Sequence, residues 1–228
     1  EQTAALIGAA PGEIVFTGGG TEADNLALLG AAAAAKPGKN HLITSAVEHY
    51  AVLNTCKYLE SKGFSVSYLP VDGTGTVDPD DVRRAVTDRT MLISIMHANN
   101  EIGTVAPLAE IAGAARQRGI LIHTDAVQSA GKLPVGVDDL AVDLLSLSGH
   151  KFYGPKGTGA LYVRRGTPLA PIMFGGHQES GLRTGTENVP GIVGLGKACE
   201  LAARELPWQM DRLLELRNRL EKLIVEKI

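Results

Sequence analysis

Short apolar runs rich in β-branched residues alternate with amphipathic stretches along almost the whole chain, and this alternation limits the fold more than any other feature. Near-continuous apolar strands separated by helices are typical of a mostly parallel sheet covered on both faces. The sequence therefore predicts an α/β fold with a seven-stranded sheet. The expected strands cover residues 13–18, 41–46, 65–70, 90–96, 120–126, 143–149 and 159–165. The expected helices between them cover residues 21–35, 50–62, 78–86 and 107–118.

Size, charge and cysteine content narrow the class of protein. A chain of 228 residues with 44% hydrophobic residues can bury the core of one large α/β domain or of two small ones. The formal net charge of −3 gives no electrostatic reason to expect nucleic acid or an anionic membrane as a partner. No apolar run is long enough to span a membrane. The 2 cysteines predict neither a disulfide framework nor a zinc site, and they indicate a cytoplasmic location.

Both ends of the sequence have helical character. The chain opens with "EQTAALIG", which has no secretory signal. Residues 206–228 carry leucine and isoleucine at helical spacing, and they predict a long amphipathic helix that runs to the last residue. Because this helix has no C-cap glycine, we expect the sequence to be part of a larger protein.

The residues that follow the strands are the candidate site, because ligands of such sheets bind beyond the carboxyl ends of the strands. The first strand leads into "GGGTEADN", where Gly20 permits a tight turn and Thr21 is expected to cap a helix that begins at Glu22. A helix N-terminus offers free N–H groups to an anion, so this stretch predicts a phosphate site. A plain helix cap after a glycine turn is the alternative.

Two further strand ends carry histidine and asparagine. His49 lies where a strand passes into a helix, a place at which a histidine is more often structural than catalytic. Asn99 and Asn100 follow the strand at 90–96 in "HANNEIGT". Asparagines form turns for local reasons, and they also donate hydrogen bonds to a ligand's oxygen.

Asp125 and Lys151 complete the set. Asp125 closes the largely apolar run "ILIHTD", so it is expected to be partly buried and to need a cationic or N–H partner. No second carboxylate is spaced to join it, so we expect no metal. Lys151 lies in "SLSGHKFYGPKGTG", between two core strands, where small neighbours, other cations or a dry pocket favour the neutral amine. A phosphate site, an acid, an amide, a flat-ring neighbour and an amine together match pyridoxal 5′-phosphate (PLP).

The motifs also carry a family resemblance that spans nearly the whole chain. The sequence resembles the cysteine desulfurases of the NifS/IscS type, in the class V aminotransferase family of fold-type-I PLP enzymes. The matching stretches are "FTGGGTEADNLAL", "TSAVEHYAVLNTC", "MHANNEIGT", "HTDAVQSAGK", "SGHKFYGPKGTGALYVRR" and "GLRTGTENVPGIVGLGKA". The resemblance implies a PLP-binding large domain over residues 1–206, with an N-terminal arm before it. Residues 207–228 would begin the helix that leads to a C-terminal small domain.

The resemblance also implies roles for single residues. Lys151 would form the Schiff base and carry a proton, and His49 would stack on the ring and take part in proton transfer. Asp125 would bind the ring nitrogen, while Asn100 and Arg183 would contact the substrate. The other implied cofactor-binding positions are Gly20, Thr21, Asn100, Gln128, Ser148, His150 and, reaching the phosphate of a neighbouring subunit, Thr186.

The implied reaction converts L-cysteine to L-alanine and passes the sulfur, as a persulfide on an enzyme cysteine, toward iron–sulfur clusters or tRNA thiolation. The implied partners are a second copy in a homodimer and a sulfur acceptor or iron–sulfur scaffold protein. Cys56 and Cys199 lie in helical patterns, so neither fits the catalytic position, which is expected beyond Ile228. Two alternatives stay open: a selenocysteine lyase, and a non-catalytic fragment that binds PLP or a partner.

Overall fold

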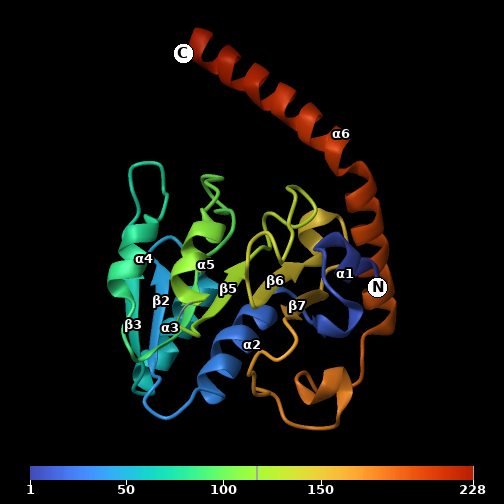
Figure 1. Ribbon diagram of the computed structural model, residues 1–228. Helices are drawn as coiled ribbons and strands as arrows, with labels where there is room; N and C mark the ends of the chain where they lie inside the picture. The colour runs from blue at the N-terminus through green and yellow to red at the C-terminus, as the bar shows by residue number, and fades with distance from the viewer. Residues whose placement is uncertain (117, 228) are drawn as a thin grey trace.

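The computed structural model describes residues 1–116 and 118–227 and shows one sheet with helices packed against it (Figure 1). The strands are β1 (Ile14–Thr17), β2 (His41–Ser45), β3 (Ser65–Leu69), β4 (Thr90–Ser94), β5 (Leu121–Asp125), β6 (Leu144–Ser148) and β7 (Gly159–Val163). The α-helices are α1 (Gln2–Leu6), α2 (Gly20–Ala33), α3 (Tyr50–Ser61), α4 (Pro79–Ala85), α5 (Leu108–Arg116) and α6 (Val189–Lys227).

The seven strands lie in the order β1-β7-β6-β5-β4-β2-β3. Strand β7 is antiparallel to both of its neighbours, and every other pairing in the sheet is parallel. The predicted mostly parallel sheet is therefore confirmed. Because β1 and β6 are both antiparallel to β7, they run in the same direction as the central strands. The carboxyl ends of β1, β2, β4, β5 and β6 consequently meet at one edge of the sheet.

Two apolar cores cover the two faces of the sheet. Side chains alternate between the faces of a strand, and in β4 Leu92 packs into one core while Ile93 packs into the other. The first core contains residues of α2 and α3, such as Val52, and the second contains residues of α4, α5 and α6, such as Ile111. Each fully buried aliphatic side chain contributes about 1.5–3 kcal/mol, so these cores hold the strand ends in fixed positions.

The predicted elements agree with the structure to within one or two residues at each end, with one exception. The helix predicted to begin at residue 206 is the latter part of α6, which begins at Val189. The first turns of α6 contain glycines, which indicate a turn rather than a helix in the sequence. In the structure these glycines permit close packing. A Cβ at Gly194 would lie 2.5 Å from Cγ of Pro155. Residue 117, which lies within the helix predicted over 107–118, and residue 228, the last of the predicted C-terminal helix, lie outside the described residues.

Helix α6 is continuous through Pro207 and extends away from the rest of the chain (Figure 1). Its last buried residue is Ala202, and its apolar side chains beyond that point, such as Leu213, are exposed. The domain boundary predicted between residues 206 and 207 stays a prediction. No helix in the described part of the chain is long and apolar enough to cross a membrane.

Candidate active site

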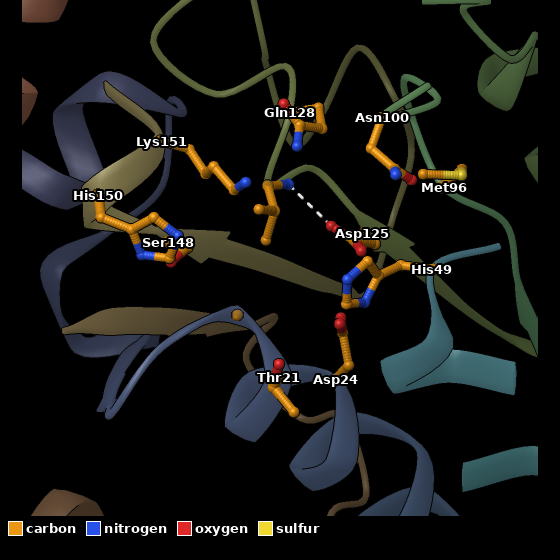
Figure 2. Close-up of a pocket in the computed structure, with 12 residues that line it drawn as sticks. Thr21, Asp24, His49, Met96, Asn100, Asp125, Gln128, Ser148, His150 and Lys151 are labelled. Atoms are coloured by element: carbon orange, nitrogen blue, oxygen red, sulfur yellow. Dashed lines mark hydrogen bonds between the residues drawn. The ribbon is translucent and has the colours of Figure 1, made fainter. Parts of the chain in front are cut away.

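A pocket of about 200 Å³ lies at the edge of the sheet where the carboxyl ends of the strands meet (Figure 2). The residues that line it lie at or after the ends of β1, β2, β4, β5 and β6, so the parallel topology brings together positions that are far apart in the sequence. They are Gly20, Thr21, Asp24, His49, Met96, Asn100, Asp125, Val127, Gln128, Ser148, His150 and Lys151.

The structure brings together every predicted cofactor-binding residue except Thr186, which is exposed outside the pocket. Arg183, predicted to bind substrate, also lies elsewhere. Its Nε is 2.8 Å from Oε1 of Glu22, and it lines a separate depression beside β1. The predicted roles of Arg183 and Thr186 therefore stay predictions.

One end of the pocket is suited to an anion. Helix α2 begins there, so the free N–H groups of its first turn and its positive dipole end face the space. A Cβ at Gly20 would lie only 2.5 Å from Cγ2 of Val127, so glycine is what lets the helix begin this close to the turn after β5. Ser148 Oγ and His150 Nδ1, 3.1 Å apart, lie on the same side and add polar groups.

The expectation that Thr21 caps a helix beginning at Glu22 is wrong. The helix begins at Gly20, its N-cap is Gly19, and no side chain bonds to the cap position. Glu22 instead accepts a hydrogen bond from the N–H of Gly18, at 2.7 Å. Because Thr21 is not needed as a cap, its hydroxyl and N–H are available at the pocket.

Asp125 ends strand β5 and is 5% exposed. Its Oδ1 accepts a hydrogen bond from the N–H of Val127 at 2.8 Å, which confirms the expected burial and N–H partner. Burial raises the pKa of Asp125, while the Val127 N–H, His49 and Lys151 act in the opposite direction. This carboxyl group therefore gains from any positive charge that enters the pocket.

The expectation that no second carboxylate joins Asp125 is wrong, because the fold brings Asp24 close to it. One carboxylate oxygen of Asp24, one of Asp125 and one ring nitrogen of His49 lie within 4.8 Å of one another. Asp24 lies one turn after Thr21 on α2. It comes close to Asp125 because α2 packs against the sheet, although the two residues are far apart in the sequence. Such a group can hold a cation, and the absence of a metal stays a prediction.

His49 has a structural role and a place in the pocket at the same time. As the N-cap of α3, its Nδ1 accepts a hydrogen bond from the N–H of Ala51 at 3.1 Å. That bond fixes the ring at the mouth of the pocket and leaves Nε2 to carry the proton of the neutral tautomer. The two readings of His49 are compatible.

The two asparagines after β4 have different roles: one forms the turn and the other faces the pocket. Asn99 holds the turn, since its Oδ1 accepts from the N–H groups of Glu101 and Ile102 and its Nδ2 donates to the carbonyl of Val47. Asn100 lines the pocket, where Figure 2 shows its side chain near Met96. The second asparagine is the one available to a ligand.

Lys151 lies in the 3₁₀ turn Gly149–Phe152, and its amine points into the pocket toward the side on which Asp125 lies (Figure 2). The chain turns tightly after this segment, and it needs glycine at position 154. A Cβ there would lie 2.9 Å from the carbonyl oxygen of Gly149. Lys151 is exposed, so the dry environment expected from the sequence is not found. The direction of its amine into the pocket is what makes Lys151 the candidate nucleophile. Lys156 in the same loop is exposed and does not line the pocket.

Four residues at or beneath the pocket escaped sequence reasoning: Asp24, Met96, Val127 and Glu48. Glu48 directly precedes His49 but points the other way, into the protein. Its Oε1 accepts hydrogen bonds from Ser45 Oγ at 2.6 Å and from the N–H of Met96 at 3.0 Å. Its Oε2 has no partner among the described residues. Burial raises the pKa of Glu48 to about 8, so this carboxyl group is protonated near neutral pH.

We expect Glu48→Gln to stabilise the chain increasingly as the pH rises from about 4.5 to about 8, the pKa values of the unfolded and folded states. The folded chain holds this proton and the unfolded chain releases it, so the wild type loses about 1.4 kcal/mol per pH unit from this group. Glutamine keeps the oxygen that accepts both bonds and puts an amide in place of the protonated oxygen. Chemical denaturation of both proteins at a series of pH values tests this, and parallel curves would contradict it.

Comparisons with known proteins agree with this geometry. Residues 1–228 match the family described as Aminotransferase class-V. A curated relative from Dictyoglomus turgidum named "Cysteine desulfurase IscS" is 56% identical over 96% of this chain and 55% of its own length. A solved structure titled "NifS-like protein" superposes with a TM-score of 0.95 at 43% identity, over 99% of this chain and 62% of that chain. Another, titled "SspA in complex with cysteine", has a TM-score of 0.84 at 52% identity, over 87% of this chain and 58% of that chain.

The sheet and its helical layers match the fold of NifS-like, fold-type-I structures, and the pocket with its acid, amine and helix N-terminus lies at the strand ends of that fold. The chain belongs to the aminotransferase class-V family, and the resemblance to NifS-like cysteine desulfurases is confirmed. The cofactor of these relatives is PLP. The chain spans about half the length of the curated relatives it matches.

Proposed function

We propose that this protein binds PLP and acts as a cysteine desulfurase. The observation that carries the proposal is the shape of the pocket, which sets the amine of Lys151 and the carboxylate of Asp125 around one space that ends at the N-terminus of α2. The relatives named cysteine desulfurase, and the related structure titled as a complex with cysteine, support the reaction and the substrate class.

The donor set fits each part of PLP. The N-terminus of α2, Gly20, Thr21, Ser148 and His150 would hold the phosphate. Asp125 would hold a proton on the ring nitrogen, which favours the cationic ring because the carboxylate is buried beside it. When bound, PLP supplies an aldehyde for the amine and a ring that draws electrons from the substrate's α-carbon.

The remaining side chains orient and move protons. His49 would lie against the ring, since its imidazole is fixed by the Ala51 N–H. Asn100 and Gln128 would donate hydrogen bonds to the ring oxygen, with Asn100 also near the substrate. Lys151 would bond to the aldehyde and then carry the α-proton of L-cysteine. We further propose a cytoplasmic homodimer, in which Thr186 reaches the partner's phosphate and Arg183 the substrate, and a protein that accepts the sulfur.

The 228-residue polypeptide, loaded with PLP, is expected to exchange the α-proton of L-cysteine but to release no sulfide. Sulfur transfer needs a thiolate, and both cysteines are fully buried. Burial raises the pKa of Cys56 to about 12 and that of Cys199 to about 11, so neither forms a thiolate at neutral pH. Proton exchange in deuterated water is followed by NMR, and sulfide and alanine are assayed in the presence of a reductant.

The curated Dictyoglomus turgidum relative serves as the positive control for sulfide release. Sulfide formed by the polypeptide and lost in Cys56→Ser or Cys199→Ser would show that the catalytic cysteine is one of these two. Faster turnover of L-selenocysteine than of L-cysteine by the full-length protein would instead indicate a selenocysteine lyase. No exchange of the α-proton of L-cysteine would count against the proposed substrate.

A further inference from the structure

Asp24 is a buried acid that faces the pocket beside Asp125 and His49 (Figure 2). It is 1% exposed, and its carboxyl oxygens lie close enough to Asp125 to place one oxygen of each group within 4.8 Å. Two buried carboxyl groups therefore lie close together beside the part of the pocket where the proposed function puts the ring nitrogen of the cofactor.

Asp24 has no compensating cation in the described part of the chain. Its Oδ1 has no hydrogen-bond partner there, and two imidazoles lie beside it. His49 uses Nδ1 to accept the Ala51 N–H, and the Nε2 of His123 lies 3.6 Å from Oδ1 of Asp24. Burial lowers the pKa of His123 to about 3, and its ring nitrogens contact the hydroxyl groups of Ser94 and Ser146 at 2.8 and 3.0 Å. His123 is therefore neutral near pH 7 and does not stabilise an ionised Asp24.

The surroundings of Asp24 and Asp125 differ, and this difference indicates which of the two carboxyl groups is ionised. Asp125 accepts the Val127 N–H, and the positive charge of Lys151 favours its ionised form. Burial, followed by the negative charge of Asp125, raises the pKa of Asp24 well above its ordinary value, and the Ser146 hydroxyl acts in the opposite direction. Two carboxylates this close do not both ionise without a large cost, so the proton resides on the acid with fewer compensating groups.

We propose that Asp24 and Asp125 form a carboxyl pair that holds a single negative charge, with the proton on Asp24 and the charge on Asp125. Asp24 is then a positioning residue, because its neutral form leaves Asp125 as the one anion facing the ring nitrogen. The identity of the ligand rests on the proposed function, whereas the charge state of the pair is a property of the chain alone. A buried acid that costs stability beside a candidate catalytic group is typical of a functional site.

The test measures unfolding of the cofactor-free chain. Glu48, the third acid near this pair, also has a raised pKa, so the measurement is made in a Glu48→Gln background. We expect Asp24→Asn to have a lower unfolding equilibrium constant than this parent. The ratio of the parent's constant to the variant's should grow by up to about tenfold for each pH unit between 5 and 8. The sign follows because the folded parent keeps the Asp24 proton, which the unfolded chain releases above about pH 4. The exposed Asp139→Asn is the matched control and should show no such trend.

A ratio of unfolding constants that stays constant over this pH range would show that Asp24 is ionised and would overturn the pair. Infrared spectra of the unmodified chain with labelled aspartate provide a readout that needs no variant to fold: a protonated aspartate at pH 7 is expected, and its absence would contradict the proposal. Asp24→Asn should also bind PLP at pH 7 within a few-fold of its parent, and a loss as large as that of Asp125→Asn would place the charge on Asp24. Failure of the parent to bind PLP would count against the proposed function alone.

Discussion

Lys151→Ala is expected to lose the covalent attachment of PLP while keeping the fold. The amine of Lys151 points into the pocket, and the side chain is exposed, so its removal leaves no cavity in a core. PLP would then be held only by the phosphate and ring contacts, and it should be removed by gel filtration under conditions in which the wild type stays yellow. The visible absorbance of the retained cofactor and the unfolding midpoint of the cofactor-free chain are the two measurements.

Lys156→Ala is the matched control for this experiment. Lys156 is an exposed lysine in the same loop that does not line the pocket, so its removal should leave the bound cofactor unchanged. Retention of colour by Lys151→Ala, together with its loss in Lys156→Ala, would assign the amine to the wrong lysine.

Asp125→Asn is expected to weaken PLP binding by about a hundredfold or more. Removing one member of a buried charge pair costs about 3–5 kcal/mol, and each 1.4 kcal/mol is about tenfold in affinity. The variant should fold at least as well as the wild type without cofactor, since burial already raises the pKa of this carboxyl group and an amide has no charge to desolvate. Cofactor affinity is measured by fluorescence titration.

The exposed Asp139→Asn should bind PLP like the wild type and shows that charge alone is not responsible. An Asp125→Asn protein with unchanged affinity and unchanged exchange of the substrate's α-proton would remove Asp125 from the proposed role. A variant that unfolds without cofactor would contradict the expected stability, because that expectation treats the ionised acid as a cost to the fold.

The sequence was sufficient to predict the sheet and most of the pocket, for a physical reason. In a parallel sheet the carboxyl ends of the strands meet at one edge, so locating the strands also locates the residues that converge there. Asp125 ends β5, and His49 and Lys151 follow β2 and β6 within a few residues, so each lies where this rule places it.

Asp24 could not be found in this way, because it stands within a helix and reaches the pocket only through the packing of α2 against the sheet. Its spacing of three residues from Thr21 puts both on one helix face, which is the signal that could have found it. The start of α6 was missed for a different reason. Glycines such as Gly194 look like turn residues in the sequence, although here they permit close contact with a neighbouring loop.

The most direct test of the account is to identify the lysine that PLP modifies. The chain is incubated with PLP, reduced with borohydride to fix the bond, digested and examined by mass spectrometry. A single modified peptide that carries the label on Lys151 is the predicted result, because that amine alone among the nearby lysines lines the pocket. A label on Lys132 or Lys156, or one spread over surface lysines, would contradict the central claim that the pocket at the strand ends is the cofactor site.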